Sequence, residues 1–184
     1  DMVAKEQVLD VGAVIVASGF EESDASHYAQ YGLGIFPNVV TSTQFERILS
    51  ASGPYGGVIT RPGDKKHPKK IAWLQCIGSR DTEHPYCSSV CCMYATKEAV
   101  IAREHSKEVE ATIFYIDIRA FGKEFDQYIE RAKQEYGVRF VKSRIASVSE
   151  MQDGSLQLAY EDDAGVLHRD VFDLVVLSVG LAST

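Results

Sequence analysis

The sequence predicts an α/β protein built on a Rossmann-like, mainly parallel sheet, and three observations predict it. Continuous apolar runs of strand length recur along the chain, as expected for strands buried on both faces. Helical patterns lie between successive runs, as in a chain that crosses over between parallel strands. Short segments separated by hairpin turns follow, which indicates an added antiparallel meander. A chain of 184 residues can bury the core that such a domain needs.

The four strongest apolar runs are the predicted strands of the parallel sheet. They are residues 12–17, 71–76, 111–116 and 174–178. A shorter run, residues 138–141, predicts a further strand. Because these runs are continuous and not alternating, we expect them in the interior of the sheet and not on a half-exposed edge.

Three helices are predicted between these strands, at about residues 43–50, 87–105 and 123–136. Thr43-x-x-Glu46 has the spacing of a capping box at the start of the first helix. Gly137 predicts the end of the third, because glycine adopts the left-handed conformation that terminates many helices.

The second half of the chain carries the pattern of a three-stranded antiparallel meander. Its predicted strands are residues 145–151, 156–161 and 166–171. The dipeptides Asp153-Gly154 and Ala164-Gly165 supply the turns, and the first is a strong hairpin signal. From residue 71 onward the order is strand, helix, strand, helix, strand, meander, strand, which is the outline of a dinucleotide-binding domain.

Residues 36–68 contain many proline and glycine turns, and the stretch 53–57 predicts a linker. We therefore divide the chain into residues 1–64 and a domain of residues 65–184. Apolar segments that end in glycine lie near both termini (residues 14–19 and 175–180). We expect from them that the chain is cut from a longer protein.

Composition excludes several classes of protein. With 45% hydrophobic residues and 17 Tyr and Phe residues (nine and eight), the chain is not disordered. A formal net charge of −7 leaves no basic surface for nucleic acid. No apolar run approaches the ~20 residues of a membrane span, and no signal peptide opens the chain. We expect a soluble, cytoplasmic protein.

All four cysteines lie in one short window, Cys76, Cys87, Cys91 and Cys92, with the pattern C-x10-C-x3-C-C. Cys76 is predicted at a strand end. Cys87 is predicted to open a helix, with Cys91 one turn further on the same face and Cys92 about 100° around it. A strand end and a helix start that meet at the same sheet edge can bring four thiolates to one metal centre.

The residues favour an iron–sulfur cluster over two alternatives. Soft thiolate ligands suit such a cluster, which tolerates irregular spacing. Structural zinc usually takes Cys-x-x-Cys pairs, which are absent here. Inert or redox-active thiols are the other alternative, and disulfides are rare in the cytosol. The spacing alone does not separate iron from zinc.

The expected phosphate-binding loop departs from the dinucleotide fingerprint. The position of G-x-G-x-x-G reads Gln75-Cys-Ile-Gly-Ser-Arg-Asp81, which keeps only Gly78 and places Cys76 and Arg80 where the cofactor would approach. Asp117 ends the next strand but lies 39 residues beyond Gly78 instead of about 20, so we interpret it as a turn residue. The pattern favours a nicotinamide-type fold in which cysteines occupy the place of the nucleotide-binding site.

Several cations are candidate neighbours of an anionic cofactor or cluster: Arg80, Lys97, Arg103 and Arg119. Lys97 lies five residues beyond Cys92, where an ammonium group would stabilise a reduced flavin or cluster. His84 lies between two of the candidate ligands, although no histidine has metal-ligand spacing. Ser88 and Ser89 have no partnered His–Asp motif, so hydrolase chemistry has no support.

These residues and motifs resemble those of the A subunit of heterodisulfide reductase and its relatives. The resemblance covers nearly the whole chain, and the paired-cysteine block is its most specific part. Family members are larger, with a flavin domain like that of thioredoxin reductase and added ferredoxin-type cluster domains. The stretches that carry the resemblance are residues 12–20, 37–42, 45–54, 75–81, 86–95 and 117–122.

The resemblance implies where the cofactors bind. Ala17-Ser18-Gly19 resembles the family's alanine-threonine-glycine signature, with Ser18 as a mild departure, and the stretch ending in Val179-Gly180 resembles the matching signature of the nicotinamide-like domain. Residues 1–64 would then be a flavin-domain segment and linker, and residues 65–184 a nicotinamide-like Rossmann domain. The flavin domain's own glycine-rich fingerprint is absent, so FAD is expected in the intact protein.

The four cysteines match the family's set of ligands for a [4Fe–4S] cluster close to the flavin. The resemblance implies an oxidoreductase that relays electrons between FAD and this cluster, with other reductase subunits or electron-transfer proteins as partners. The thiolates are then ligands and not acid–base catalysts, and this chain alone is expected to be inactive. Two alternatives remain: an NAD(P)-binding dehydrogenase domain, and a zinc-stabilised interaction domain without catalysis. The expected cofactor-binding residues are Ala17, Ser18, Gly19, Gly78, Arg80, Lys97, Val179 and Gly180.

Overall fold

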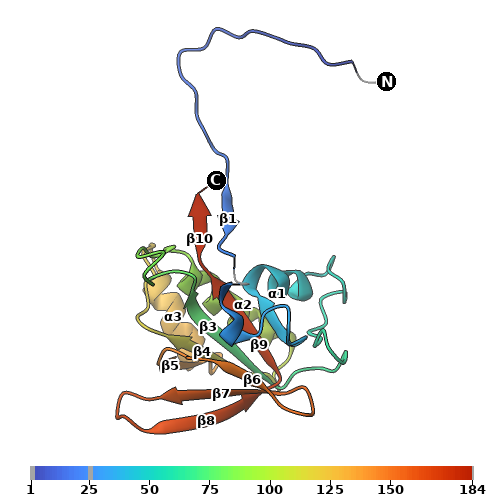
Figure 1. Ribbon diagram of the computed structural model, residues 1–184, viewed down its shortest axis with the longest axis vertical. Helices are drawn as coiled ribbons and strands as arrows, with labels where there is room; N and C mark the ends of the chain where they lie inside the picture. Colours follow the sequence, from blue (N-terminus) through green and yellow to red (C-terminus); the bar gives the residue numbers. More distant parts are fainter. Residues whose placement is uncertain (1–2, 25–26, 184) are drawn as a thin grey trace.

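A five-stranded parallel sheet forms the centre of the molecule (Figure 1). The computed structural model describes residues 3–24 and 27–183. Along the sheet the strands are β2 (Val39–Thr41), β9 (Leu174–Val179), β3 (Lys70–Ile77), β4 (Glu110–Tyr115) and β5 (Arg139–Lys142). Every pairing between these neighbours is parallel. The predicted α/β, Rossmann-like class is confirmed.

Three helices pack on one face of this sheet. They are α1 (Ser42–Leu49), α2 (Cys91–His105) and α3 (Phe125–Gln134). Trp73 on β3 and Phe45 on α1 are fully buried between the layers, and their rings meet edge to face at 5.4 Å. Ala95 and Ala99 let α2 approach the sheet closely, since neither carries a side chain beyond Cβ.

The predicted meander covers the opposite face. It consists of β6 (Val148–Glu150), β7 (Leu156–Glu161) and β8 (Leu167–Phe172), paired antiparallel. Because side chains alternate along a strand, β3 presents Ala72 and Leu74 to this second core and Trp73 to the helices. Figure 1 shows the meander at the end of the body farthest from the chain termini.

A two-stranded antiparallel ribbon projects from the body at the other end (Figure 1). It pairs β1 (Phe20–Glu22) with β10 (Leu181–Ser183) and follows directly on β9 through Gly180. A single turn of 3-10 helix, η2 (Ala29–Tyr31), comes between β1 and β2. Both ends of the chain therefore leave the body side by side.

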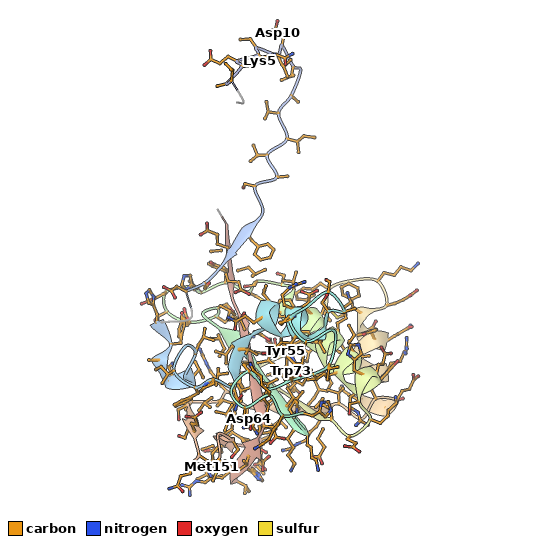
Figure 2. All side chains as sticks on the ribbon, turned by 90° about the vertical axis from the view of Figure 1, so that its right-hand side faces the viewer. Lys5, Asp10, Tyr55, Asp64, Trp73 and Met151 are labelled. Carbon is orange, nitrogen blue, oxygen red and sulfur yellow. The ribbon has the colours of Figure 1, made fainter. Side chains whose placement is uncertain are left out.

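The prediction of a buried strand at residues 12–17 is wrong for this chain. The segment forms no strand pairing among the described residues, and Val14, Ile15 and Val16 are 78–91% exposed. Figure 2 shows Lys5 and Asp10 far from the body, whereas Trp73 lies inside it. An apolar run becomes a buried strand only where a sheet edge and a covering layer are present, and here neither contacts it.

Two predicted helix starts are also corrected. The first helix begins one residue earlier than predicted and uses another capping box. The Thr41 side chain accepts a hydrogen bond from the backbone N–H of Gln44, and the Gln44 side chain accepts one from the backbone N–H of Thr41. The third helix begins at Phe125, after Glu124 in a left-handed conformation. A capping pattern alone does not distinguish between neighbouring candidates, and packing of the apolar face decides.

The parallel sheet includes a strand that the sequence did not predict. β2 has only three residues and lies within the stretch interpreted as rich in turns, yet it pairs with β9 and is fully buried. The sheet therefore draws strands from both sides of the predicted boundary after residue 64. Within residues 3–24 and 27–183, no helix has the length and apolar character that crossing a bilayer requires.

Candidate metal centre

The cysteines gather at the carboxyl-terminal edge of the parallel sheet. Cys76 lies near the end of β3, where the register with β9 shifts between Leu74 and Ile77. Cys91 and Cys92 are the first residues of α2. This edge, where strands end and helices begin, is where open α/β sheets bind their ligands.

Cys87 does not open a helix, which corrects the prediction. It lies in the loop before α2, four residues ahead of the first helical residue. Ser89 has a φ of 66° and prevents helix from extending back to Cys87. The consequence favours a metal centre, because Cys87 comes to the site from a loop and not from the helix face.

The four thiols are free and lie close enough to interact electrostatically. Cys76, Cys91 and Cys92 are buried, at 7%, 8% and 7% exposure, and Cys87 is half-buried. No three Cys, His, Asp or Glu side chains in the described part of the chain converge closely enough to hold a single metal ion. The thiols are therefore neighbours at this edge of the sheet.

The backbone around the thiols is strained. Cys76, Arg80 and Ser89 have φ values of 62°, 57° and 66°, a left-handed conformation that costs a residue with a side chain of the order of 1 kcal/mol. The register shift before Ile77 is a β-bulge. Together with the positive φ at Cys76, it turns the Cys76 side chain away from the regular alternation along β3. Such strain concentrates at functional sites, where the surrounding structure maintains it.

Backbone groups provide hydrogen bonds to the sulfur atoms. The N–H of Ser89 donates to Cys87 Sγ at 3.3 Å, and the N–H of Arg119 donates to Cys92 Sγ at 3.4 Å. The Cys91 thiol donates to the carbonyl of Val179 at 3.9 Å. N–H donors of this kind stabilise negative charge on sulfur and tune the potential of a bound cluster.

Burial favours the protonated form of three of the metal-free thiols. It raises the pKa of Cys76 and Cys91 above the ordinary value and that of Cys92 to about 11. Only a thiolate reacts rapidly with alkylating agents, and only an accessible one is reached by them.

We therefore expect iodoacetamide to modify the metal-free chain first at Cys87. Cys87 is half-buried and the other three thiols are buried, so the difference in rate should be about tenfold or more at a pH of about 7.5. Mass spectrometry of quenched digests measures it residue by residue. Equal rates at all four cysteines would show that the thiols are not held as the structure has them.

Two arginines and one aspartate adjoin the thiols. Asp117, which follows β4, forms ion pairs with Arg80 and with Arg119, the latter through Nε at 3.2 Å. Although burial favours the neutral acid, hydrogen bonds from Arg119 and Arg80 hold the pKa of Asp117 below its usual range. The positive charge of Arg80 also lowers the pKa of the Cys76 thiol, against the larger effect of burial.

The predicted glycines have packing roles at the same edge. Gly180 N–H donates to the carbonyl of Ile77 at 2.7 Å, and a Cβ on Gly180 would lie 2.4 Å from the carbonyl oxygen of Gly78. Gly78 has a φ of 68° and is packed under Ser23 and Tyr28. Both glycines thus let the end of β9 approach the loop that follows Cys76.

The remaining predicted residues lie in two other places. Ala17, Ser18 and Gly19 are exposed on the segment that precedes β1. Lys97 is on α2 and lines a cavity of about 620 Å³ together with Val90, Met93 and Tyr94 of the same helix region and Phe125 of α3. The structure therefore groups Cys76, Cys87, Cys91, Cys92, Gly78, Arg80, Val179 and Gly180 at one edge, with Lys97 beside it and residues 17–19 beyond the ribbon.

Other candidates have structural partners. His84 pairs with Asp81 at 3.8 Å and packs edge-on against Tyr86. Arg103 donates to the carbonyls of Tyr136 and Val109. The contacts of His84 lie within the loop before α2, whereas those of Arg103 tie the segments before β4 and after α3 to α2.

Sequence reasoning misses two residues of this site. The interpretation of Asp117 as a turn residue gives too little weight to two signals, its place at the end of the strand and the arginine two positions later. Tyr94 has the helical spacing of a core residue, yet its hydroxyl donates to the carbonyl of Val179 at 3.2 Å, next to Cys91. Its signal is weak, because a tyrosine at helical spacing usually only packs.

Comparison with known proteins gives a consistent result. The chain is 45% identical over 177 residues to iron-sulfur A subunit 2 of the CoB–CoM heterodisulfide reductase of Methanopyrus kandleri, covering 94% of this chain and 27% of that protein. It is 40% identical over 184 residues to the A subunit of the H2:CoB–CoM heterodisulfide,ferredoxin reductase of Methanothermobacter marburgensis, covering 98% of this chain and 28% of that protein. No protein-family model matches the chain.

A third relative has the same relation to the chain. The iron-sulfur A subunit of the CoB–CoM heterodisulfide reductase of Methanocaldococcus jannaschii is 39% identical over 186 residues, covering 99% of this chain and 28% of that protein. The chain thus spans little more than a quarter of the length of these curated relatives. The predicted resemblance is confirmed: over nearly its whole length, this chain is related to a segment of the A subunit of heterodisulfide reductase.

Proposed function

We propose that Cys76, Cys87, Cys91 and Cys92 bind a [4Fe–4S] cluster and that the intact protein relays electrons between this cluster and FAD. The observation that carries the proposal is the meeting of four free thiols, from two separate stretches of chain, at the ligand-binding edge of the sheet. Two relatives are named iron-sulfur subunits, and this chain has the cysteines that such a role needs.

The donor set suits a four-iron cluster better than zinc. One zinc ion draws its ligands to about 2.3 Å from a single point, whereas a cluster takes one thiolate at each of four irons and spaces them more widely. All four candidate ligands are soft thiols, which suit an iron–sulfur cluster. Strained, buried positions and backbone N–H donors to sulfur agree with this choice.

A nicotinamide site is less well supported at the same edge. A bound pyrophosphate needs open backbone at the glycine loop. Here Ser23 and Tyr28 lie 3.1 Å from where a Cβ on Gly78 would be, and Gly180 approaches from the other side. The space that the phosphates would occupy is therefore filled by this chain's own atoms.

The ribbon suggests how the segment connects to a flavin domain. β1 and β10 bring residues 17–19 and Gly180 to the same end of the body, as expected for a domain inserted into another. FAD bound by the flanking domain would exchange electrons with the cluster across this end. Lys97, in the cavity beside α2, would place a positive charge toward the reduced flavin or cluster.

Partners are proposed from the same chemistry. A cluster transfers one electron at a time, so the intact protein needs electron donors and acceptors, and we propose other reductase subunits or a ferredoxin-like protein. The ultimate reaction of the assembly would be reduction of a disulfide.

The proposal is tested by anaerobic reconstitution of the chain with iron and sulfide. We expect a broad absorption band near ~400 nm and about four irons per chain. Cys76→Ser should lose the band and most of the iron, while Ser89→Ala, in the loop that carries Cys87, should retain both. Far-UV circular dichroism checks that both variants fold.

Two results would contradict the proposal. One is stoichiometric zinc with no iron after reconstitution, which would favour a structural metal and an interaction role. The other is full iron content in Cys76→Ser, which would mean that Cys76 is not a ligand.

A further inference from the structure

Asp117 orients two arginines toward the cysteine site. Its carboxylate pairs with Arg80 and accepts from Arg119 Nε at 3.2 Å and Nη2 at 3.4 Å. An arginine bound through two of its N–H groups is fixed in direction as well as position. Asp117 therefore fixes the direction of the Arg119 guanidinium and holds that of Arg80 in place by a single contact through Nη1.

The members of this Arg80–Asp117–Arg119 network act on three of the thiols. The charge of Arg80 acts on Cys76, and that of the Arg119 side chain acts on Cys87. The Arg119 N–H donates to Cys92 Sγ at 3.4 Å, and the Asp117 carbonyl accepts from the same thiol at 3.8 Å. The fourth thiol, Cys91, is instead bound to Val179.

The network places more positive than negative charge at the site. Two guanidinium groups and one carboxylate leave one unit of positive charge beside the thiols. The groups are partly sheltered, since the Arg80 side chain is 20% exposed and that of Arg119 is 37% exposed. Charges in such positions are screened less by salt than those on an open surface.

A cluster on four thiolates becomes more negative when it takes up an electron, so fixed positive charge and N–H donors favour its reduced form. Resting on the proposed function above, we propose that the Arg80–Asp117–Arg119 network raises the reduction potential of the cluster on Cys76, Cys87, Cys91 and Cys92. Asp117 is the positioning residue, and the two arginines supply the charge.

The experiment is a dithionite titration of the reconstituted chain, followed by electron paramagnetic resonance. Arg80→Gln and Arg119→Gln should each shift the midpoint potential to a more negative value. Arg169→Gln removes the same charge from an exposed position on β8 and should leave the potential unchanged. Asp117→Asn keeps both cations but releases them, and should give a broader, heterogeneous resonance than the wild type.

The outcomes separate this proposal from the one on which it rests. A wild-type chain without iron contradicts the proposed function, whereas a loaded wild type with unchanged potentials in both Gln variants overturns the network alone. If a Gln variant does not load iron, the corresponding variant Arg80→Lys or Arg119→Lys decides. Lysine keeps the charge, so a midpoint close to that of the wild type supports the proposal, and a clearly more negative midpoint overturns it.

Discussion

Gly180→Ala is expected to destabilise the chain by about 3 kcal/mol or more, and to reduce iron loading with it. The added Cβ would lie 2.4 Å from the carbonyl oxygen of Gly78 and 3.0 Å from Ser79 Cβ. The first of these is a backbone atom, so no side-chain rotation relieves the contact, and overpacking of this kind costs of the order of 1–3 kcal/mol even where side chains can yield.

The loss of iron has the same origin. Gly180 is hydrogen-bonded to Ile77 on one side and to Ser23 on the other. Moving either strand end shifts the loop that follows Cys76. Iron content per folded chain after reconstitution should therefore fall together with stability.

Urea unfolding monitored by circular dichroism measures the free-energy change. Gly12→Ala is the matched control, because a Cβ at Gly12 meets nothing within 4 Å, and it should change the free energy of unfolding by less than about 0.5 kcal/mol. If Gly180→Ala unfolds at the wild-type urea concentration, the close approach of β9 to the Gly78 loop does not exist in solution.

Glu98→Gln is expected to stabilise the chain at alkaline pH. Glu98, on α2, is 6% exposed and accepts from Trp73 Nε1 at 2.8 Å. Burial raises its pKa to about 8, against the hydrogen bond from Trp73, and the charges of Glu46 and Glu22 raise it further. Glutamine keeps an acceptor for Trp73 and never carries the charge.

The sign follows from where the proton is bound. Between the unfolded pKa near 4.5 and the folded pKa of about 8, the folded chain holds a proton on Glu98 that the unfolded chain has released. Stability contributed by this group is therefore complete at low pH and falls as pH rises through that window. The loss between about pH 5 and pH 8 should be on the order of 3–5 kcal/mol.

The measurement is the difference in unfolding free energy between Glu98→Gln and wild type at several pH values. This difference should grow in favour of the variant from about pH 5 to pH 8 and level off above that. Glu108→Gln, at an exposed position, controls for the change in net charge and should show little dependence. A difference that stays constant with pH would mean that Glu98 is ionised in the folded chain at neutral pH.

The sequence predicted which strands and helices form better than it predicted the residues at which they begin. Continuous apolar runs predicted β3, β4 and β9 because strands buried on both faces have no polar side to alternate. Asp153-Gly154 predicted its hairpin because few residues adopt the required turn. Helix starts were less certain, since Thr41 and Thr43 are both good caps and only the burial of Phe45 and Ile48 against the sheet selects between them.

For the candidate site, the sequence by itself determined the residue types: four cysteines in one window, with too few glycines for a nucleotide loop. The tertiary structure decided the rest. It brought Asp117 and Arg119 from the end of β4 to the thiols of β3 and α2, because neighbouring parallel strands end at the same edge of the sheet. It also left residues 12–17 exposed, because an apolar strand is buried only by neighbours, which sequence periodicity does not reveal.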